Sequence, residues 1–454
     1  MPDMEIDVRH MGIRIVGVLA ACLCIFACSP VWEDEFEIDY SRPALNPGDR
    51  EVVDDPRNVL LLYSAGYNSL TSYLTEDIEE LKSGWLPGSQ RDDDVVLVYS
   101  HFPASSGNYS VPTSPVLTHL YTRADGETVA DTLVVYDPSV ISSSPGQFNE
   151  VLTYVRDAFP ASGYGLIFSS HATGYLPAGF YQKPGGYIYK GDVMRQMALE
   201  WQGAVAYPYV ELPQDPSLPA VKSIGQDQVG TPGSYISYEM DLIDFAAAIP
   251  MKLDYILFDA CLMGGIEVAY QLRDKASIVG FSQAEVLAEG LDYKMLTTHL
   301  LKDGTPDPIV VCKDYFEQYD VQEGVYRSAT ISAVDCDKLE PLAQICRQLF
   351  NKYASEISEL SYSVVQRYYR SSHHWFYDLE SILLEAGITD AELAALHEAL
   401  DLCVLYKGHT PSFMNTFDIH TFSGFSMYLP SHGNDELNKY YKTLDWDIAT
   451  GLIR

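Results

Sequence analysis

One cysteine of this chain lies where a protein would prepare a sulfur nucleophile. Residues 255–258 (YILF) form a dense apolar run, short enough for a buried strand, and they lead into Asp259-Ala260-Cys261. After two glycines the apolar residues recur at three- and four-residue spacing, which predicts a helix. The N–H groups and the positive dipole end at the start of a helix favour a thiolate. Cys261 is therefore a candidate nucleophile.

A histidine upstream of this cysteine could act as its base. His171 follows another apolar run, residues 164–169 (YGLIFS). In sheets of parallel strands, functional sites lie beyond the carboxyl ends of the strands. His171 and Cys261 would then meet at one edge of a sheet, where the imidazole could take the proton of the thiol. This pairing predicts covalent catalysis by cysteine.

The elements that must position the pair alternate between short apolar strands and amphipathic helices. Strands are predicted at residues 58–63, 94–99, 132–136, 164–169, 255–258 and 279–283, and helices at 70–81, 148–159, 240–249, 338–360 and 390–407. The alternation favours an α/β fold, in which helices cover both faces of a mostly parallel sheet. Residues 175–235 are rich in Gly, Pro, Tyr and Gln, and they are predicted to be an insertion near the site, either a lid or a surface loop.

Composition limits the class of partner. The chain has 454 residues and a formal net charge of −34, which argues against nucleic acid as a ligand because phosphate binding needs a basic face. The charge suits basic peptides or proteins, although solubility alone would also account for it. The number and spacing of the cysteines predict no disulfide framework and show no zinc-ligand spacing.

The N-terminus predicts export. Basic residues precede an apolar run at residues 15–27, which is too short to span a bilayer permanently and is typical of a secretion signal. Its end resembles a bacterial lipoprotein signal, in which Cys28, or alternatively Cys22, would be lipidated. An ordinary cleaved signal is the remaining alternative. Residues 1–28 are thus predicted to be the signal and 29–57 an acidic flexible tether, which places a lipid-anchored protein in the bacterial cell envelope, periplasmic or at the surface.

Several segments together resemble the clostripain-like cysteine peptidases, which have a caspase-like fold. The segments FSSHATGY and LFDACLMGGIEVAY correspond to the family's histidine and cysteine strands, and the second match is quite specific. Weaker similarity is carried by NVLLLYSAGYNSL, GFSQAEVLAEGLDY, SATISAVDCDKLEPLA and GFSMYLP. The resemblance covers residues 58–454. It implies a peptidase core at 58–310 and a C-terminal α/β region at 311–454 that completes the fold.

The resemblance also implies roles for individual residues. Cys261 would attack the scissile carbonyl, and His171 would act as general base and acid in cleavage after Arg or Lys. Asp259 lies two residues before Cys261 on a strand, so both side chains point to the same face. A carboxylate there opposes a thiolate unless a substrate cation neutralises it, although Asp259 could instead hold a loop. Glu289 or Glu285 is a candidate second acid.

Two departures from the family pattern concern catalysis. The family's glycine after the histidine is Ala172 here, and its N–H would form the oxyanion hole together with that of Cys261. Alanine disfavours a positive φ, so activity would fall if the loop needs that conformation. The loop after the first strand reads GYNSL, where relatives more often carry Asp-Asn. The alternative function is therefore a catalytically impaired relative that acts as a surface binding lipoprotein.

Further expectations concern cofactors, processing and assembly. The resemblance implies calcium for some relatives only, and this sequence shows no EF-hand spacing. We therefore expect no metal or other cofactor. We also expect a monomer. The resemblance implies that some relatives are activated by cleavage in the insertion, where Lys190, Arg195 and Lys222 are basic residues that could be cut. The pair His373-His374 is predicted to be structural, because no acid or histidine lies at helical ligand spacing beyond it.

Overall fold

The computed structural model of the chain describes residues 57–90, 93–105, 107–189, 205–208, 217–219, 227–231, 234–302, 304–370 and 375–454. All of them belong to one of the two units into which internal contacts divide the chain, Glu37–Arg454. The predicted lipidation sites Cys28 and Cys22, the candidate cleavage residues Lys190, Arg195 and Lys222 and the histidine pair lie outside the described residues. None of the described helices is both long and apolar enough to cross a membrane.

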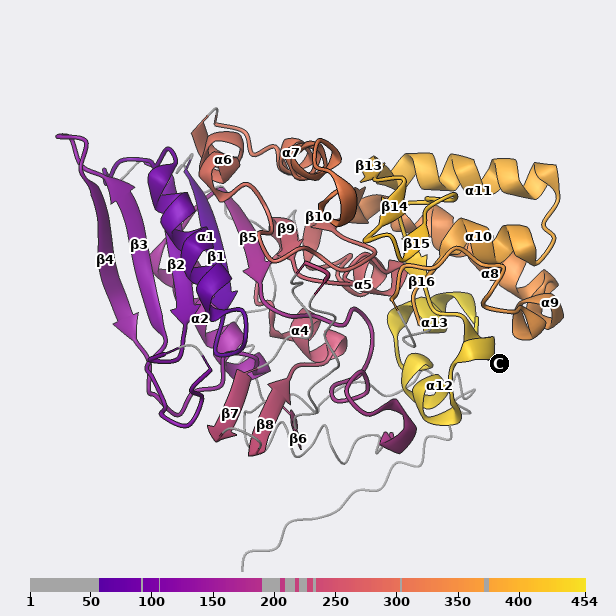
Figure 1. The fold of residues 1–454 in the computed structure, drawn as a ribbon. Helices are drawn as coiled ribbons and strands as arrows, with labels where there is room; N and C mark the ends of the chain where they lie inside the picture. The colour runs from indigo at the N-terminus through magenta and orange to yellow at the C-terminus, as the bar shows by residue number, and fades with distance from the viewer. Residues whose placement is uncertain are drawn as a thin grey trace, which may run out of the picture. The chain divides into compact units, whose positions relative to one another are not determined.

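A nine-stranded sheet runs through the described part of the chain (Figure 1). The strands follow the order β13-β11-β10-β9-β5-β1-β2-β3-β4. The five from β10 to β2 pair in parallel, and antiparallel strands extend the sheet on both sides. The bounds are β1 (Asn58–Ala65), β2 (Val95–His101), β3 (Val116–Thr122), β4 (Thr128–Val135), β5 (Gly163–Ser169), β9 (Leu253–Asp259), β10 (Ala276–Phe281), β11 (Thr330–Asp335) and β13 (Val404–His409).

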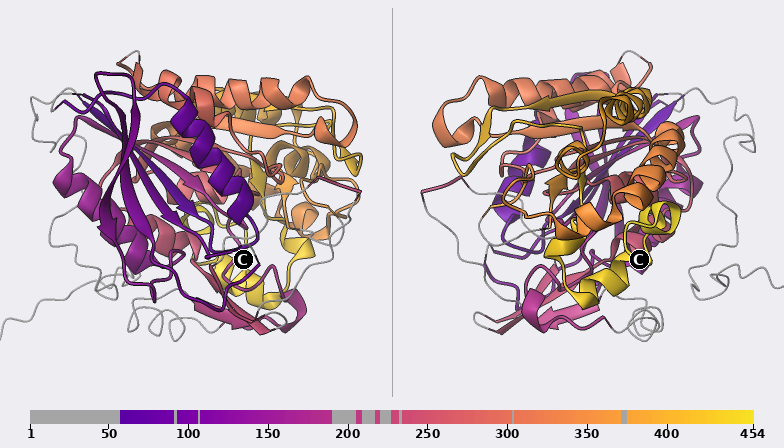
Figure 2. Two further views of the ribbon diagram at one scale, coloured as in Figure 1. Left: turned by 60° about the vertical axis from the view of Figure 1, so that its left-hand side comes forward. Right: turned by 90° about the vertical axis from the view of Figure 1, so that its right-hand side faces the viewer.

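Helices cover both faces of this sheet, which confirms the predicted fold class. Figure 2 shows α1 and α2 on opposite sides of the strands. α1 packs against α6, whereas α2 packs against α4, which also contacts α5. The bounds are α1 (Thr71–Ser83), α2 (Pro145–Ala158), α4 (Leu242–Ala248), α5 (Ile266–Gln271), α6 (Tyr293–Thr297), α7 (Pro308–Asp320), α8 (Leu339–Lys352), α9 (Ala354–Glu359), α10 (Leu379–Glu385), α11 (Asp390–Cys403), α12 (Asp435–Tyr441) and α13 (Asp445–Thr450).

The parallel strands owe their position to continuous apolar runs. In β1 every residue after Asn58 is buried, and β5 is buried throughout. Strands that are covered on both faces have this pattern, because helices lie above and below them. Stacked tyrosines from β1 and β2, Tyr63 and Tyr99, have ring centroids 4.3 Å apart and fill one layer beneath the helices.

Several predicted elements differ in the structure. The helix predicted at 390–407 ends at Cys403, and Val404 begins β13, which pairs with β11. The helix predicted at 338–360 is two helices, because α8 ends before Tyr353 and α9 follows it. β3 was not predicted because polar Thr118 and His119 separate its buried leucines.

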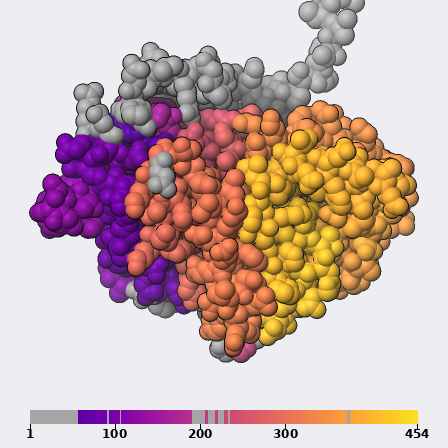
Figure 3. All heavy atoms as spheres, turned by 90° about the horizontal axis from the view of Figure 1, so that it is seen from above, coloured from indigo at the N-terminus to yellow at the C-terminus, as the bar shows by residue number. Residues whose placement is uncertain are grey.

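The insertion contains regular structure that its composition did not predict. Within and just after it, β6 (Val205–Pro208), β8 (Ser234–Glu239) and β7 (Asp227–Thr231) form a small antiparallel sheet in that order. Two further two-stranded sheets lie in the C-terminal region: β12 (Tyr377–Asp378) with β16 (Ser426–Met427), and β14 (Ser412–Phe413) with β15 (Phe417–Asp418). In Figure 3 the N-terminal residues (indigo) and the C-terminal residues (yellow) lie on opposite sides of the view.

A buried glutamate connects α5, the helix that follows the cysteine, to the C-terminal region. Glu267 is fully buried in the first turn of α5, and its Oε1 accepts hydrogen bonds from the Tyr428 N–H at 2.9 Å and the Tyr441 hydroxyl at 2.6 Å. Burial raises the pKa of Glu267 to about 7. The Ser426 N–H also donates to the Gly264 carbonyl at 2.8 Å, so the C-terminal region supports the start of the helix.

This glutamate predicts a pH-dependent stability. Its pKa lies near 4.5 in an unfolded chain and at about 7 in the folded one, so the folded state binds more protons between these values. The free energy of unfolding should therefore fall as pH rises through this interval. Glu267→Gln cannot ionise and should be more stable than the natural protein near pH 8, by up to about 3 kcal/mol, but equal near pH 4. Urea denaturation at both pH values measures the difference, and exposed Glu150→Gln is the control. The same pH slope for both variants would contradict this role.

Candidate active site

The pairing of β5 with β9 determines where His171 and Cys261 lie. The two strands are parallel neighbours, and their register ends at Ser169 opposite Asp259. Each candidate residue follows its member of that pair by two positions, and neighbouring strands are about 4.8 Å apart. The structure thus places the imidazole and the thiol at the same carboxyl edge of adjacent strands.

The thiol of Cys261 is covered by the loop that follows β10. The side chain is fully buried, and the Val286 N–H donates to its Sγ at 3.1 Å. Sγ also lies 3.7 Å from the Val286 carbonyl oxygen. Nearby, the Leu262 N–H donates to the Ala284 carbonyl at 2.9 Å, so this covering loop (residues 282–291) runs alongside the cysteine turn.

The backbone of the cysteine turn is strained. Leu262, directly after Cys261, adopts a left-handed φ of 62°, which costs a non-glycine residue on the order of 1–3 kcal/mol. Gly174 of the histidine loop approaches it so closely that a Cβ there would lie 2.4 Å from the Leu262 carbonyl oxygen. Glycine at 174 is therefore required both by this contact and by its own φ of 60°. The cysteine turn and the histidine loop therefore pack closely against each other at Leu262 and Gly174.

A serine that the sequence did not single out contacts the histidine. His171 is buried, and its Nε2 lies 3.2 Å from the Ser69 Oγ, in the loop after β1. Asn68 shapes that loop, because its side chain donates to the Ala65 carbonyl at 3.0 Å and accepts from the Leu70 N–H at 2.9 Å. The sequence did carry a signal for this contact, because Ser69 lies in GYNSL, the segment that departs from the family pattern. In the structure this segment presents a hydroxyl to the imidazole.

The concern about Ala172 does not apply to the conformation seen here. Among the described residues, the non-glycine residues with positive φ are Leu262, Met414 and Asn415. Ala172 is therefore outside the left-handed region, and a Cβ is compatible with its backbone. The left-handed position of the histidine loop is filled by Gly174 instead.

The three candidate acids lie in different environments. Asp259 is fully buried, and its Oδ2 accepts from the Tyr293 hydroxyl at 2.6 Å and the Ser169 hydroxyl at 3.2 Å. Burial, followed by the charge of Asp259, raises the pKa of Tyr293, which therefore stays a donor. Glu285 is also buried and binds the guanidinium of Arg370 through both oxygens. Glu289 is exposed on the covering loop.

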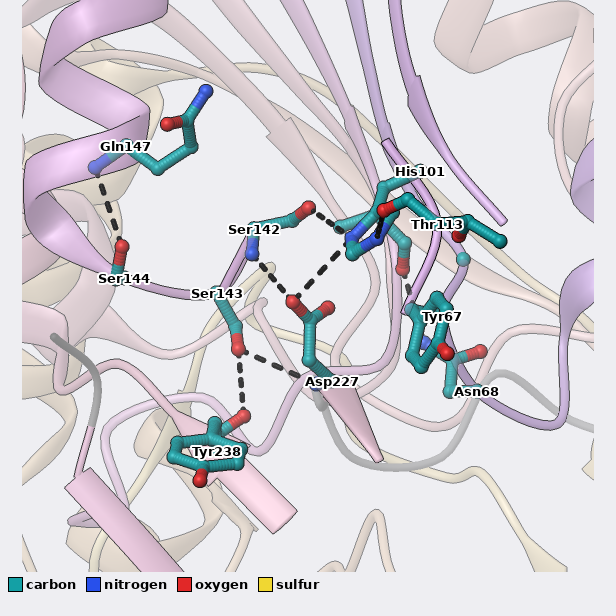
Figure 4. Close-up of polar contacts among 12 residues, drawn as sticks. Tyr67, Asn68, His101, Thr113, Ser142, Ser143, Ser144, Gln147, Asp227 and Tyr238 are labelled. Atoms are coloured by element: carbon teal, nitrogen blue, oxygen red, sulfur yellow. Dashed lines mark hydrogen bonds and ion pairs between the residues drawn. The ribbon is translucent and has the colours of Figure 1, made fainter. Parts of the chain in front are cut away.

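A second polar cluster lies at the same edge of the sheet, two strands away from β5 (Figure 4). His101, at the end of β2, donates from Nε2 to the Thr113 carbonyl at 3.1 Å. Its Nδ1 lies 2.7 Å from the Ser142 Oγ and 3.6 Å from the Asp227 Oδ2. Asp227 begins β7, and its Oδ2 accepts from the Ser142 N–H. The cluster thus fastens the insertion's small sheet to the core.

Ser142, His101 and Asp227 contain the residue types of a serine hydrolase, but their geometry differs. In such enzymes opposite ring nitrogens of the histidine face the serine and the carboxylate, whereas here Nδ1 faces both. Ser142 and Asp227 are also completely buried. We therefore assign this cluster a structural role. The described residues contain no group of three or more His, Cys, Asp or Glu arranged to hold a metal ion.

The assignment predicts that Asp227 holds the insertion in place. Asp227→Ala removes the acceptor of the Ser142 N–H and the carboxylate beside His101, which should lower the free energy of unfolding by about 1–3 kcal/mol. Limited proteolysis should cut the insertion faster, with exposed Asp125→Ala as the control. Unchanged cleavage and melting in Asp227→Ala would show that the cluster does not fasten β7.

The backbone of Ala172 also gives a stability prediction. Ala172→Gly should destabilise the protein by about 0.4–1 kcal/mol, because glycine adds conformational freedom to the unfolded chain without relieving strain. Thermal unfolding monitored by calorimetry measures the change. A more stable glycine variant would mean that position 172 requires a positive φ after all.

Comparisons with known proteins identify a family for this sequence and solved structures with a similar fold. Residues 62–185 and 214–450 match the model of the clostripain family, peptidase family C11. An inactive zymogen C11 protease from Parabacteroides distasonis is 24% identical, with a TM-score of 0.66 over 87% of this chain and 98% of that chain. A secreted C11 cysteine protease from Bacteroides thetaiotaomicron, in complex with an irreversible peptide inhibitor, is 21% identical, with a TM-score of 0.65 over 87% of this chain and 98% of that one. None of the curated proteins compared matches the chain.

Proposed function

Because this chain belongs to the clostripain family and is a cysteine-type peptidase, we propose that it cleaves peptide bonds after Arg or Lys through Cys261 and His171. The observation that carries the proposal is the register of β5 with β9, which brings these two residues to one edge of the sheet. His171 takes the thiol proton, and the Cys261 thiolate attacks the scissile carbonyl carbon.

The remaining steps follow from the same two residues. The N–H groups of Ala172 and Cys261 stabilise the oxyanion of the tetrahedral intermediate. His171 then protonates the leaving amine, which leaves an acyl-enzyme on the sulfur. It next takes a proton from water as the water attacks the thioester, so that the acid is released and the thiol restored. His171 returns that proton to the sulfur, and Ser69, hydrogen-bonded to Nε2, orients the ring during these transfers.

The preference for basic residues is supported by charge. Asp259 lies two residues before Cys261 on β9, and Glu285 lies on the covering loop next to Val286, whose N–H contacts the sulfur. The whole chain carries a net charge of −34. Desolvated carboxylates attract a guanidinium or ammonium group strongly. Basic peptides or proteins are therefore the proposed substrates, without nucleic acid, metal or another cofactor.

Access to the thiol requires a rearrangement of the covering loop. Cys261 is fully buried, and the Val286 backbone lies against its sulfur. A substrate carbonyl can reach Sγ only after the residues that bury it move, and the Val286 backbone of the covering loop is one of them. This burial is also the observation that favours the second candidate function, a surface binding lipoprotein that keeps the fold without turnover.

The proposed location is the bacterial cell envelope. It is supported by the basic and apolar N-terminal run and by Cys28, which would carry the lipid anchor. The tether of residues 29–57 would hold a monomeric peptidase away from the membrane.

The catalytic proposal predicts which cysteine is essential. Cys261→Ala should lower kcat/KM for Arg- and Lys-terminated fluorogenic peptides by a factor of about 10³ or more, because the nucleophile is lost. Cys312→Ala is the matched control. This thiol is equally buried in the same core, but burial raises its pKa to about 12, and it has no part in the proposed mechanism. Equal rates for the natural protein and Cys261→Ala would exclude Cys261 as the nucleophile.

A further inference from the structure

An arginine from the C-terminal region binds the acid next to the covered thiol. Val286 holds the Cys261 sulfur, and the adjacent residue, Glu285, binds Arg370. The Arg370 Nη2 donates to Oε1 at 2.7 Å, and its Nε donates to Oε2. This is the two-pronged geometry by which a guanidinium binds a carboxylate most strongly.

The pair is largely shielded from water. The Glu285 side chain is 8% exposed and that of Arg370 22%. Breaking such a pair by removing one partner leaves the other charge uncompensated, which is strongly unfavourable. A substrate cation that is to bind Glu285 must therefore first displace the Arg370 guanidinium.

Arg370 is also electrostatically close to the reacting sulfur. Burial raises the pKa of Tyr181 well above its usual value, with further contributions from the charges of Glu285 and Cys261, whereas Arg370 lowers it. The buried phenol of Tyr181 thus interacts electrostatically with Glu285, Cys261 and Arg370. These four groups therefore lie within electrostatic range of one another.

We propose that Arg370 is a specificity-determining residue of this peptidase, because its guanidinium occupies the carboxylate that would otherwise bind the basic side chain of a substrate. The inference rests on the proposed cleavage after basic residues. Arg370 acts as an internal competitor: it weakens the binding of basic side chains and, through Glu285, stabilises the covering loop over Cys261. The space that it fills already fits a guanidinium group.

The competition can be measured by binding, without turnover. In a Cys261→Ala background, Arg370→Ala should bind butylguanidine, which reproduces the arginine side chain together with its Cα, about tenfold more tightly than Cys261→Ala alone does in calorimetry. Adding Glu285→Gln to Arg370→Ala should abolish the gain. Arg367→Ala is the matched control: this arginine lies in the same segment but donates to the Thr416 carbonyl and should leave the affinity unchanged. Arg370→Gln, which keeps most of the side chain, guards against misfolding and should also bind more tightly.

Turnover separates this inference from the proposed function. With Cys261 present, Arg370→Ala should lower KM for both peptides because the covering loop opens more easily, but it should lower KM several-fold more for a peptide with Arg before the scissile bond than for the peptide with neutral citrulline there. Tighter butylguanidine binding without cleavage of any Arg or Lys peptide would support the role of Arg370 and refute the proposed activity. If neither Arg370→Ala nor Arg370→Gln binds butylguanidine more tightly than Arg367→Ala, the inference is overturned.

Discussion

The site depends on the parallel pairing of β5 with β9. This pairing ends at Ser169 opposite Asp259, so the chains that leave the two strands emerge side by side, carrying His171 and Cys261. A slip of one residue would move the side chains of either strand to the other face of the sheet. Continuous apolar runs, covered by helices on both faces, stabilise the register. The chemistry is thus positioned by the most buried part of the fold.

The parts that surround the pair restrain it in a closed arrangement. The covering loop binds the sulfur through Val286, and Gly174 locks the histidine loop against Leu262. Tyr293 binds Asp259 and Arg370 binds Glu285, so both buried acids have partners within the chain. In a low-dielectric site, a charge pair such as Arg370 with Glu285 resists separation. The structure therefore describes a peptidase whose candidate thiol is covered.

The sequence predicted what depends on local pattern. Apolar runs of strand length identified β1, β2, β5 and β9, and the polar residues directly after two of them identified the candidate pair. β3 and β13 were missed because polar residues interrupt the first and a helical pattern runs into the second. The contact of Glu285 with Arg370 could not be predicted, because 85 residues separate the partners and only tertiary packing joins them. The same holds for Ser69 with His171 and for Asp227 with His101.

The most direct test of the account is covalent labelling of the thiol. The purified protein would be incubated with an arginine-directed irreversible peptide inhibitor, and the modified residue would be identified by mass spectrometry of its proteolytic fragments. The account predicts one adduct per chain, on Cys261, and none after His171→Ala, because the imidazole generates the thiolate. Absence of an adduct, or modification of Cys312, Cys336, Cys346 or Cys403 in place of Cys261, would contradict it.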